Sequence, residues 1–74
     1  MPSHKARPNH DLHLARVHAQ MSRTRLAERS GVSRKHLDSI EKGEHRVRMD
    51  TAARIANALD KDIADIFRIE DVIG

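Results

Sequence analysis

The stretch from Ser22 to Gly43 contains the same local pattern twice, and this repetition constrains the fold more than any other feature of the chain. In each copy an apolar residue precedes a serine, and a leucine follows four residues after that serine. A serine at this place is a good helix N-cap, because its hydroxyl accepts a hydrogen bond from a backbone amide of the first turn. A glycine, which readily takes the left-handed conformation that terminates a helix, ends each copy. The pattern predicts two short helices, at about 23–30 and 34–41.

Two helices joined by so short a turn cannot lie antiparallel and must cross steeply, as in a helix-turn-helix. In the second helix Leu37 and Ile40 share the face that turns toward the core. Polar side chains occupy its other positions, namely Arg34, Lys35, Asp38 and Ser39. An arginine and a lysine at the start of a helix can reach guanine edges in a DNA major groove. The alternative is a solvated helix face without a ligand, which is the more common use of charged residues.

This stretch resembles the helix-turn-helix of the phage repressor and Cro (XRE-type) family of DNA-binding proteins. The matching residues are Ser22, Leu26-Ala27, Gly31-Val32-Ser33, Ile40-Glu41 and Gly43. The resemblance extends from about His10 to Phe67. It implies an all-α, compact, five-helix domain like that of lambda repressor, with the helix-turn-helix at the second and third helices. We expect the first helix at about 10–20, the fourth from a cap at Asp50-Thr51 to Leu59, and the fifth after a cap at Asp62.

The resemblance also implies roles for individual residues, with the recognition helix 34–41 in the major groove of double-stranded DNA. The expected base-contacting residues are Arg34, Lys35, Asp38 and Ser39. The expected phosphate-contacting residues are Arg23, Ser33, His36, Lys42, His45, Arg46 and Arg48. Arg16 and Glu41 match positions that form a structural ion pair between the first and third helices. Arg23 stands where the family usually has glutamine, so the side-chain amide bridge to the third helix is lost.

The distribution of charge agrees with DNA as the partner, although the net charge is only +3. Up to Met49 there are eleven basic and five acidic residues, a balance of +6, and from Asp50 onward there are three basic and six acidic residues, a balance of −3. The basic half coincides with the helix-turn-helix, as expected for a surface that contacts phosphates. Phe67 is the single aromatic residue, which argues against stacking on the bases of single strands.

Other functional classes find little support in the sequence. The 74 residues are enough for one domain with a small core, and the absence of cysteine rules out disulfides and thiolate metal sites. The six histidines are not accompanied by a ligand set with zinc spacing, so we expect no metal and no cofactor. His36, Asp38 and Ser39 lie on one exposed helix and cannot align as a catalytic triad. With no membrane-spanning run and no signal peptide, we expect a soluble, cytoplasmic protein that is not an enzyme.

Three segments are expected along the chain: a basic, flexible arm at 1–9, the DNA-binding domain at 10–68 and a short tail at 69–74. Periodicity leaves open which of two apolar stripes of the first helix faces the core, the one with Leu12, Ala15 and Ala19 or the one with Leu14, Val17 and Met21, and we expect parts of both to be inside. The apolar residues of the tail must also be covered. The tail either folds back on the first or fifth helix, which we favour, or forms part of a dimer interface. Without the proline that relatives often have at the position of Val47, the loop at 42–48 is expected to be freer.

The sequence therefore predicts a small transcriptional regulator, more specifically a repressor, that binds duplex DNA as a homodimer on a palindromic operator. Two alternatives keep the same fold. The first is an antitoxin or adaptor whose main surface binds another protein, and such a module would tolerate alanine at Arg34 and Lys35. The second is a recombination-directionality or architectural factor, which would bend DNA without controlling a promoter.

Overall fold

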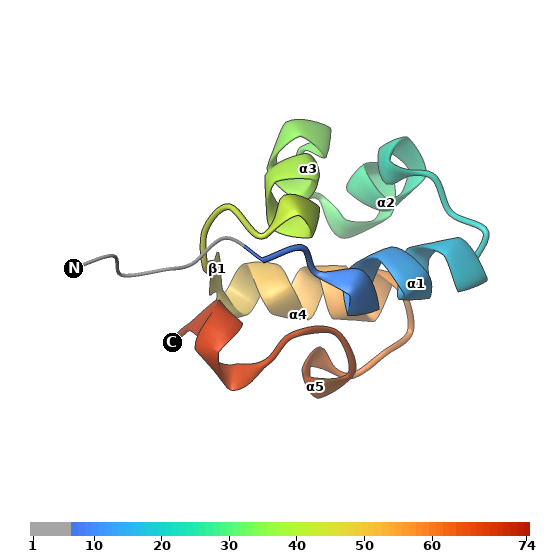
Figure 1. The fold of residues 1–74 in the computed structure, drawn as a ribbon. Helices are drawn as coiled ribbons and strands as arrows, with labels where there is room; N and C mark the ends of the chain where they lie inside the picture. Colours follow the sequence, from blue (N-terminus) through green and yellow to red (C-terminus); the bar gives the residue numbers. More distant parts are fainter. Residues whose placement is uncertain (1–6) are drawn as a thin grey trace.

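The structure is a computed structural model that describes residues 7–74. Its helices are α1 (His10–His18), α2 (Arg23–Ser30), α3 (Arg34–Lys42), α4 (Met49–Ala58) and α5 (Ile63–Ile66). Strand β1 (Val47–Arg48) precedes α4, and a short 3-10 helix, η1 (Ile69–Asp71), and strand β2 (Val72–Ile73) follow α5. Figure 1 shows α2 and α3 together on one side of α1 and α4, with α5 on the other side. The predicted five-helix, essentially all-α fold with a helix-turn-helix at α2 and α3 is confirmed.

Serine caps and left-handed glycines begin and end α2 and α3, as the repeated pattern in the sequence predicts. The hydroxyls of Ser22 and Ser33 each accept a hydrogen bond from the backbone amide of the third residue of their helix, at 3.0 and 3.1 Å. Gly31 and Gly43 follow the helices in the left-handed conformation, with φ of +74° and +71°. Helix α2 has the predicted bounds, and α3 is one residue longer than predicted because Lys42 continues the helix.

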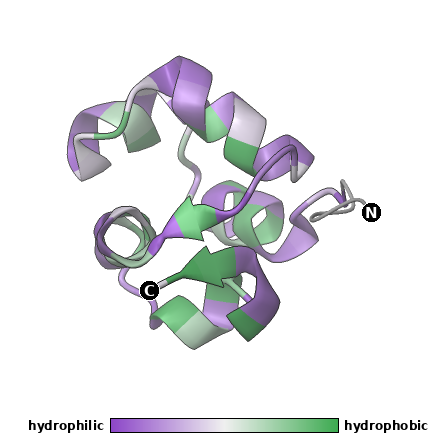
Figure 2. Ribbon diagram, turned by 90° about the vertical axis from the view of Figure 1, so that its left-hand side faces the viewer, coloured by the Kyte–Doolittle hydropathy of each residue, from purple (hydrophilic) through white to green (hydrophobic). Residues whose placement is uncertain are grey.

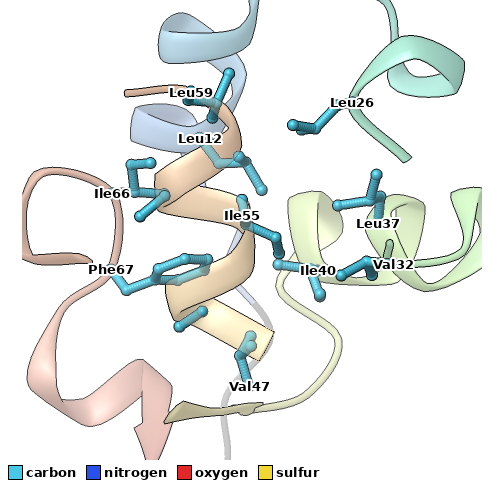
Figure 3. Packing of buried hydrophobic residues seen from close by; sticks show 12 residues of the cluster. Leu12, Leu26, Val32, Leu37, Ile40, Val47, Ile55, Leu59, Ile66 and Phe67 are labelled. Atoms are coloured by element: carbon cyan, nitrogen blue, oxygen red, sulfur yellow. The ribbon is translucent and has the colours of Figure 1, made fainter. Parts of the chain in front are cut away.

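Helix α4 runs through the centre of the hydrophobic core. Figure 3 shows Ile55 of α4 between side chains of the helix-turn-helix and those of the C-terminal part of the chain. The largest fully buried side chains are Leu12, Leu26, Leu37, Ile40, Ile55 and Ile66. Burial of such a side chain contributes about 1.5–3 kcal/mol. Because these residues come from α1, α2, α3, α4 and α5, the core fixes the helix-turn-helix relative to the rest of the domain.

Parts of both apolar stripes reach the core, as expected: the first stripe through α1 itself, and the second only through Met21, which lies beyond the end of the helix. Leu12 is fully buried and Ala15 packs against the core, whereas Leu14 and Val17 remain about half exposed. Ala19, which belongs to the same stripe as Leu12, is exposed because α1 ends at His18, earlier than the predicted end. The interior stripe is therefore only two residues long in α1.

The loop and the tail that flank α4 pair with each other in a small parallel sheet. Val47 of β1 aligns with Val72 of β2, and Arg48 with Ile73. In Figure 2 the two arrows lie side by side, with β2 hydrophobic along its length. The expectation of a freer loop is wrong, because Val47 is buried in the core. The tail does fold back, but onto β1 rather than onto the first or fifth helix, and Ile69 and Ile73 stay exposed.

The sheet also determines where α4 begins. The predicted cap at Asp50-Thr51 is wrong, since the helix starts at Met49 and its N-cap residue, Arg48, makes no side-chain capping bond. Arg48 is the last residue of β1, so the extended backbone of the strand leads directly into the first turn. Asp62 does occupy the N-cap of α5, and its backbone amide donates to the Asp65 carboxylate at 3.0 Å.

The segment that precedes α1 is attached to the domain at residues 7–9. The side chain of Asn9 caps α1 by accepting from the amide of Leu12 at 3.0 Å. The backbone amide of Asn9 donates to the carbonyl of Glu41 at 2.8 Å, and Arg7 lies 3.4 Å from a carboxylate oxygen of Asp71. The predicted arm at 1–9 is thus anchored at its end, while residues 1–6 lie outside the described residues.

Candidate nucleic-acid interface

The outward surface of α3 carries the residues predicted to contact bases. Arg34 and Lys35, in the first turn, are exposed, and Asp38 and Ser39, one turn later, are half-buried. Leu37 and Ile40 on the opposite side pack into the core and hold the helix in place. Ser33, the N-cap residue of α3, is also exposed. Its hydroxyl accepts the capping hydrogen bond, so the hydroxyl hydrogen is available to a phosphate oxygen.

Four of the predicted phosphate-contacting residues lie between the last residue of α3 and the end of β1. Lys42, His45, Arg46 and Arg48 are all exposed. Arg48 lies 3.6 Å from the carboxylate of Asp50, and both side chains are largely in solvent. Such a surface pair contributes little and leaves the arginine available to another anion.

Two histidines connect this loop to α3. The ring centroids of His36 and His45 are 5.6 Å apart, with the planes tilted by 38°. His45 Nδ1 lies 3.1 Å from the carbonyl oxygen of Arg46, which orients the ring. The loop is therefore in contact with the first turn of α3 at His36.

A buried carboxylate, Glu41, ties α3 to α1. Arg16 Nε donates to Glu41 Oε2 at 2.8 Å, and Arg16 Nη1 donates to the carbonyl of Met21 at 3.0 Å. The side chains of Arg16 and Glu41 are only 11% and 5% exposed. The two residues that the family resemblance pairs are thus in direct contact at the inner end of the recognition helix.

Two further basic side chains lie near Glu41. His13 Nδ1 lies 3.4 Å from Glu41 Oε1, and Arg23 Nη2 lies 3.6 Å from the same oxygen. Burial by itself raises the pKa of Glu41, but the hydrogen bond and charge of Arg16, together with Arg23 and His13, outweigh it and lower the pKa below its usual value of 4.5. The carboxylate therefore stays ionised and acts as a fixed negative centre for α1, α2 and α3.

Sequence reasoning missed His13, and it did not foresee the contacts of Arg23. His13 precedes Arg16 by three residues, so both side chains lie on one face of α1, and this spacing is the signal that could have found it. Arg23 Nε lies 3.3 Å from Asp38 Oδ1. The side-chain amide bridge between α2 and α3 is indeed absent, but an ion-pair bridge from Arg23 to Asp38 and Glu41 takes its place.

The comparisons with known proteins agree with this geometry. The model of a family described as helix-turn-helix, of the XRE type, matches residues 12–66. The chain belongs to this helix-turn-helix family. The match covers α1 to α5, so that the resemblance identified from the motif holds for the whole helical domain. No curated protein and no solved structure gives a significant match to the chain.

Membership of the helix-turn-helix family places the chain among DNA-binding regulatory proteins, a class that is not typically enzymatic. Within residues 7–74 no group of three or more histidine, cysteine or acidic side chains is arranged to hold a metal ion. None of the helices in this range is both long and apolar enough to cross a membrane.

Proposed function

We propose that this helix-turn-helix protein is a small transcriptional regulator, acting as a repressor, that binds a specific duplex sequence with α3 in the major groove. The observation that carries the proposal is the position of Arg34 and Lys35 at the exposed start of a helix whose other end is held in the core. An arginine fork at this place can donate two hydrogen bonds to O6 and N7 of a guanine. Asp38 and Ser39 complete the proposed base-contacting set.

The charged groups around α3 support a phosphate-binding role. We assign phosphate contacts to Arg23, Ser33, His36, Lys42, His45, Arg46 and Arg48, which lie before, on and after the recognition helix. Contacts of this kind fix the position of the protein on the duplex but carry no sequence information. They account for a salt-dependent affinity for any DNA, to which the residues of α3 add the preference for one sequence.

A single α3 reads only a few base pairs, so the proposal includes a symmetric homodimer on a palindromic operator. Helix-turn-helix dimers bind half-sites that are about 34–36 Å apart, one turn of the duplex. A cytoplasmic location is part of the same proposal. Sedimentation of the protein with and without a duplex that contains two half-sites measures this arrangement directly.

The first test is the dependence of affinity on salt. If each protomer engages about five phosphates, the logarithm of the binding constant falls with the logarithm of salt concentration at a slope of about −4 to −5, and about twice that for a dimer. Fluorescence anisotropy with a labelled duplex measures the slope. An affinity for duplex DNA that does not change between low and physiological salt would contradict the DNA-binding function.

The second test compares Arg34→Ala with Arg54→Ala on a selected duplex and on a scrambled duplex. Arg54 is an exposed arginine of α4 outside the basic half, so its replacement controls for the loss of one charge. We expect Arg34→Ala to lose about 1–3 kcal/mol on the selected duplex and much less on the scrambled one, with no such difference for Arg54→Ala. Equal losses on both duplexes would exclude α3 as the sequence-reading element, and unchanged binding would favour the adaptor alternative.

A further inference from the structure

The contact between Arg23 and Asp38 joins the first residue of α2 to the outward side of α3. Arg23 Nε and Asp38 Oδ1 are 3.3 Å apart, and the two side chains are 40% and 34% exposed. Each of these two atoms is shielded from solvent, and neither has a hydrogen-bond partner among the described residues. Oδ1 is therefore directed inward and held by charge. The exposed surface of the Asp38 side chain therefore belongs to its other atoms, and Oδ2 is the only polar atom among them.

A carboxylate at this position is unfavourable for DNA binding unless its charge is compensated, because it approaches a strongly negative duplex. Arg23 supplies the compensation from α2, at the ion-pair distance given above. Glu41 adds a second constraint, because its Oε1 lies 3.6 Å from Nη2 of the same guanidinium. Arg23 is therefore held between two carboxylates of α3 and cannot move without releasing Asp38.

We propose that Asp38 is a specificity-determining residue whose Oδ2 accepts a hydrogen bond from the exocyclic amino group of a cytosine in the major groove, and that Arg23 is its positioning residue. This inference rests on the proposed function. A carboxylate can only accept hydrogen bonds, and cytosine N4 is the donor that aspartate contacts in the major groove. Guanine and thymine present no hydrogen-bond donor there, so Asp38 repels them, and the amino group of adenine lies beside the N7 acceptor, which is unfavourable next to a carboxylate.

The first arm of the experiment tests the base preference. Random duplexes are selected with the full chain and with Asp38→Asn, a variant of nearly the same shape that removes the charge and adds a donor. The wild type is expected to require cytosine at one position of each half-site. Asp38→Asn is expected to lose that requirement and to favour adenine there, because an asparagine amide pairs with adenine N6 and N7. The affinity of the wild type for a duplex changed only at this cytosine should fall by about tenfold.

The second arm tests the positioning role of Arg23 by a mutant cycle on the selected duplex. Arg23→Ala should lower affinity more than the matched control Arg29→Ala, which removes an exposed arginine at the other end of α2. Adding Asp38→Asn to Arg23→Ala should restore part of the loss, because no uncompensated carboxylate then faces the DNA. Arg23→Lys keeps the charge and should retain the cytosine preference better than Arg23→Ala. Circular dichroism verifies the fold of each variant, and if Arg23→Ala is unfolded, Arg23→Lys and the Asp38→Asn selection carry the test.

The results separate this inference from the proposed function. If Asp38→Asn selects the same sequence as the wild type at every position, the role of Asp38 is overturned while sequence-specific binding stands. If Asp38→Asn lowers the affinity of Arg23→Ala further, Arg23 does not act through Asp38. If the wild type selects no sequence at all, the proposed function fails, and the inference fails with it.

Discussion

The two ends of α3 are built from similar local elements but have opposite surroundings. At its start, Ser33, Arg34 and Lys35 are exposed, and a Cβ atom added to Gly31 before them would meet no other atom within 4 Å. At its end, Glu41 is 7% exposed, and a Cβ atom added to Gly43 would overlap the backbone carbonyl of Arg7. One end is free to meet a ligand, and the other is enclosed by the N-terminal segment and α1.

This difference shows how a small domain can orient a recognition helix. The side chains of Arg34 and Lys35 at the start of α3 point into solvent, whereas its other end is tied down by the bond from Asn9 to Glu41 and by the ion pairs of Glu41. Rigid support of this kind keeps base-contacting side chains in place without covering them. The following predictions test whether stability resides at the enclosed end and binding at the exposed end.

The largest effect is expected from breaking the pair of Arg16 and Glu41. Replacement of either residue by alanine should lower the free energy of unfolding by about 3 kcal/mol, because a buried charge then loses its partner. The double variant should lose less than the sum of the two single variants, because no lone charge remains from this pair. Urea unfolding monitored by circular dichroism measures all three values. Additive losses would mean that the two residues act independently.

A smaller loss of stability is expected from alanine at the two glycines that end α2 and α3, and the loss should differ between them. Gly31→Ala should cost about 1–2 kcal/mol, the penalty for a side chain in the left-handed conformation. Gly43→Ala should cost at least about 1 kcal/mol more, because its φ is nearly the same but its Cβ would overlap the Arg7 backbone. The difference in unfolding free energy therefore isolates the packing of the N-terminal segment on α3. Equal losses would show that this segment does not press on Gly43.

Acid should weaken the enclosed end selectively. The pKa of Glu41 is lower in the folded protein than its usual value of 4.5, so the ionised carboxylate stabilises the fold above that value. This contribution is lost as the pH falls below about 4.5 and through the lowered pKa of the folded state. Thermal unfolding of the wild type and of Glu41→Gln at a series of pH values should show a difference that shrinks in this range. A constant difference down to pH 3 would contradict the assignment.

The elements that the sequence predicted well depend on local interactions. The caps at Ser22 and Ser33 and the left-handed Gly31 and Gly43 each involve residues only a few positions apart, and the bounds of α2 and α3 followed from them. Arg16 and Glu41 were found only through the family resemblance, because nothing in their sequence separation links them. The proposed base contacts at Arg34 and Lys35, in contrast, came from their position in the first turn of the helix.

The elements that were predicted wrongly depend on contacts between distant parts of the chain. The pairing of Val47 with Val72 has no local signature, because two residues are too few for a strand pattern. With that pairing, α4 starts before the expected cap at Asp50, and Val47 is buried at the end of a loop that was expected to be freer. The bridge from Arg23 to Asp38 was missed for a related reason, since it requires the crossing of α2 and α3 in three dimensions.

The smallest expected effect on stability, from Ser33→Ala compared with Ser22→Ala, tests the exposed end most directly. Each change removes one capping bond, of 3.1 and 3.0 Å, and each should cost about 1 kcal/mol of unfolding free energy. The first turn of α3 carries Arg34 and Lys35, so fraying there should reduce affinity for the selected duplex more than equal fraying of α2. Urea unfolding and anisotropy measure the two quantities on the same samples. Because Ser33 is itself a proposed phosphate contact, Ser33→Asn serves as a second variant, since it restores the cap without the hydroxyl and without adding a charge. If Ser33→Asn recovers stability but no affinity, the hydroxyl matters more than the cap. Equal affinities for Ser33→Ala and Ser22→Ala would show that the order of this turn does not limit binding.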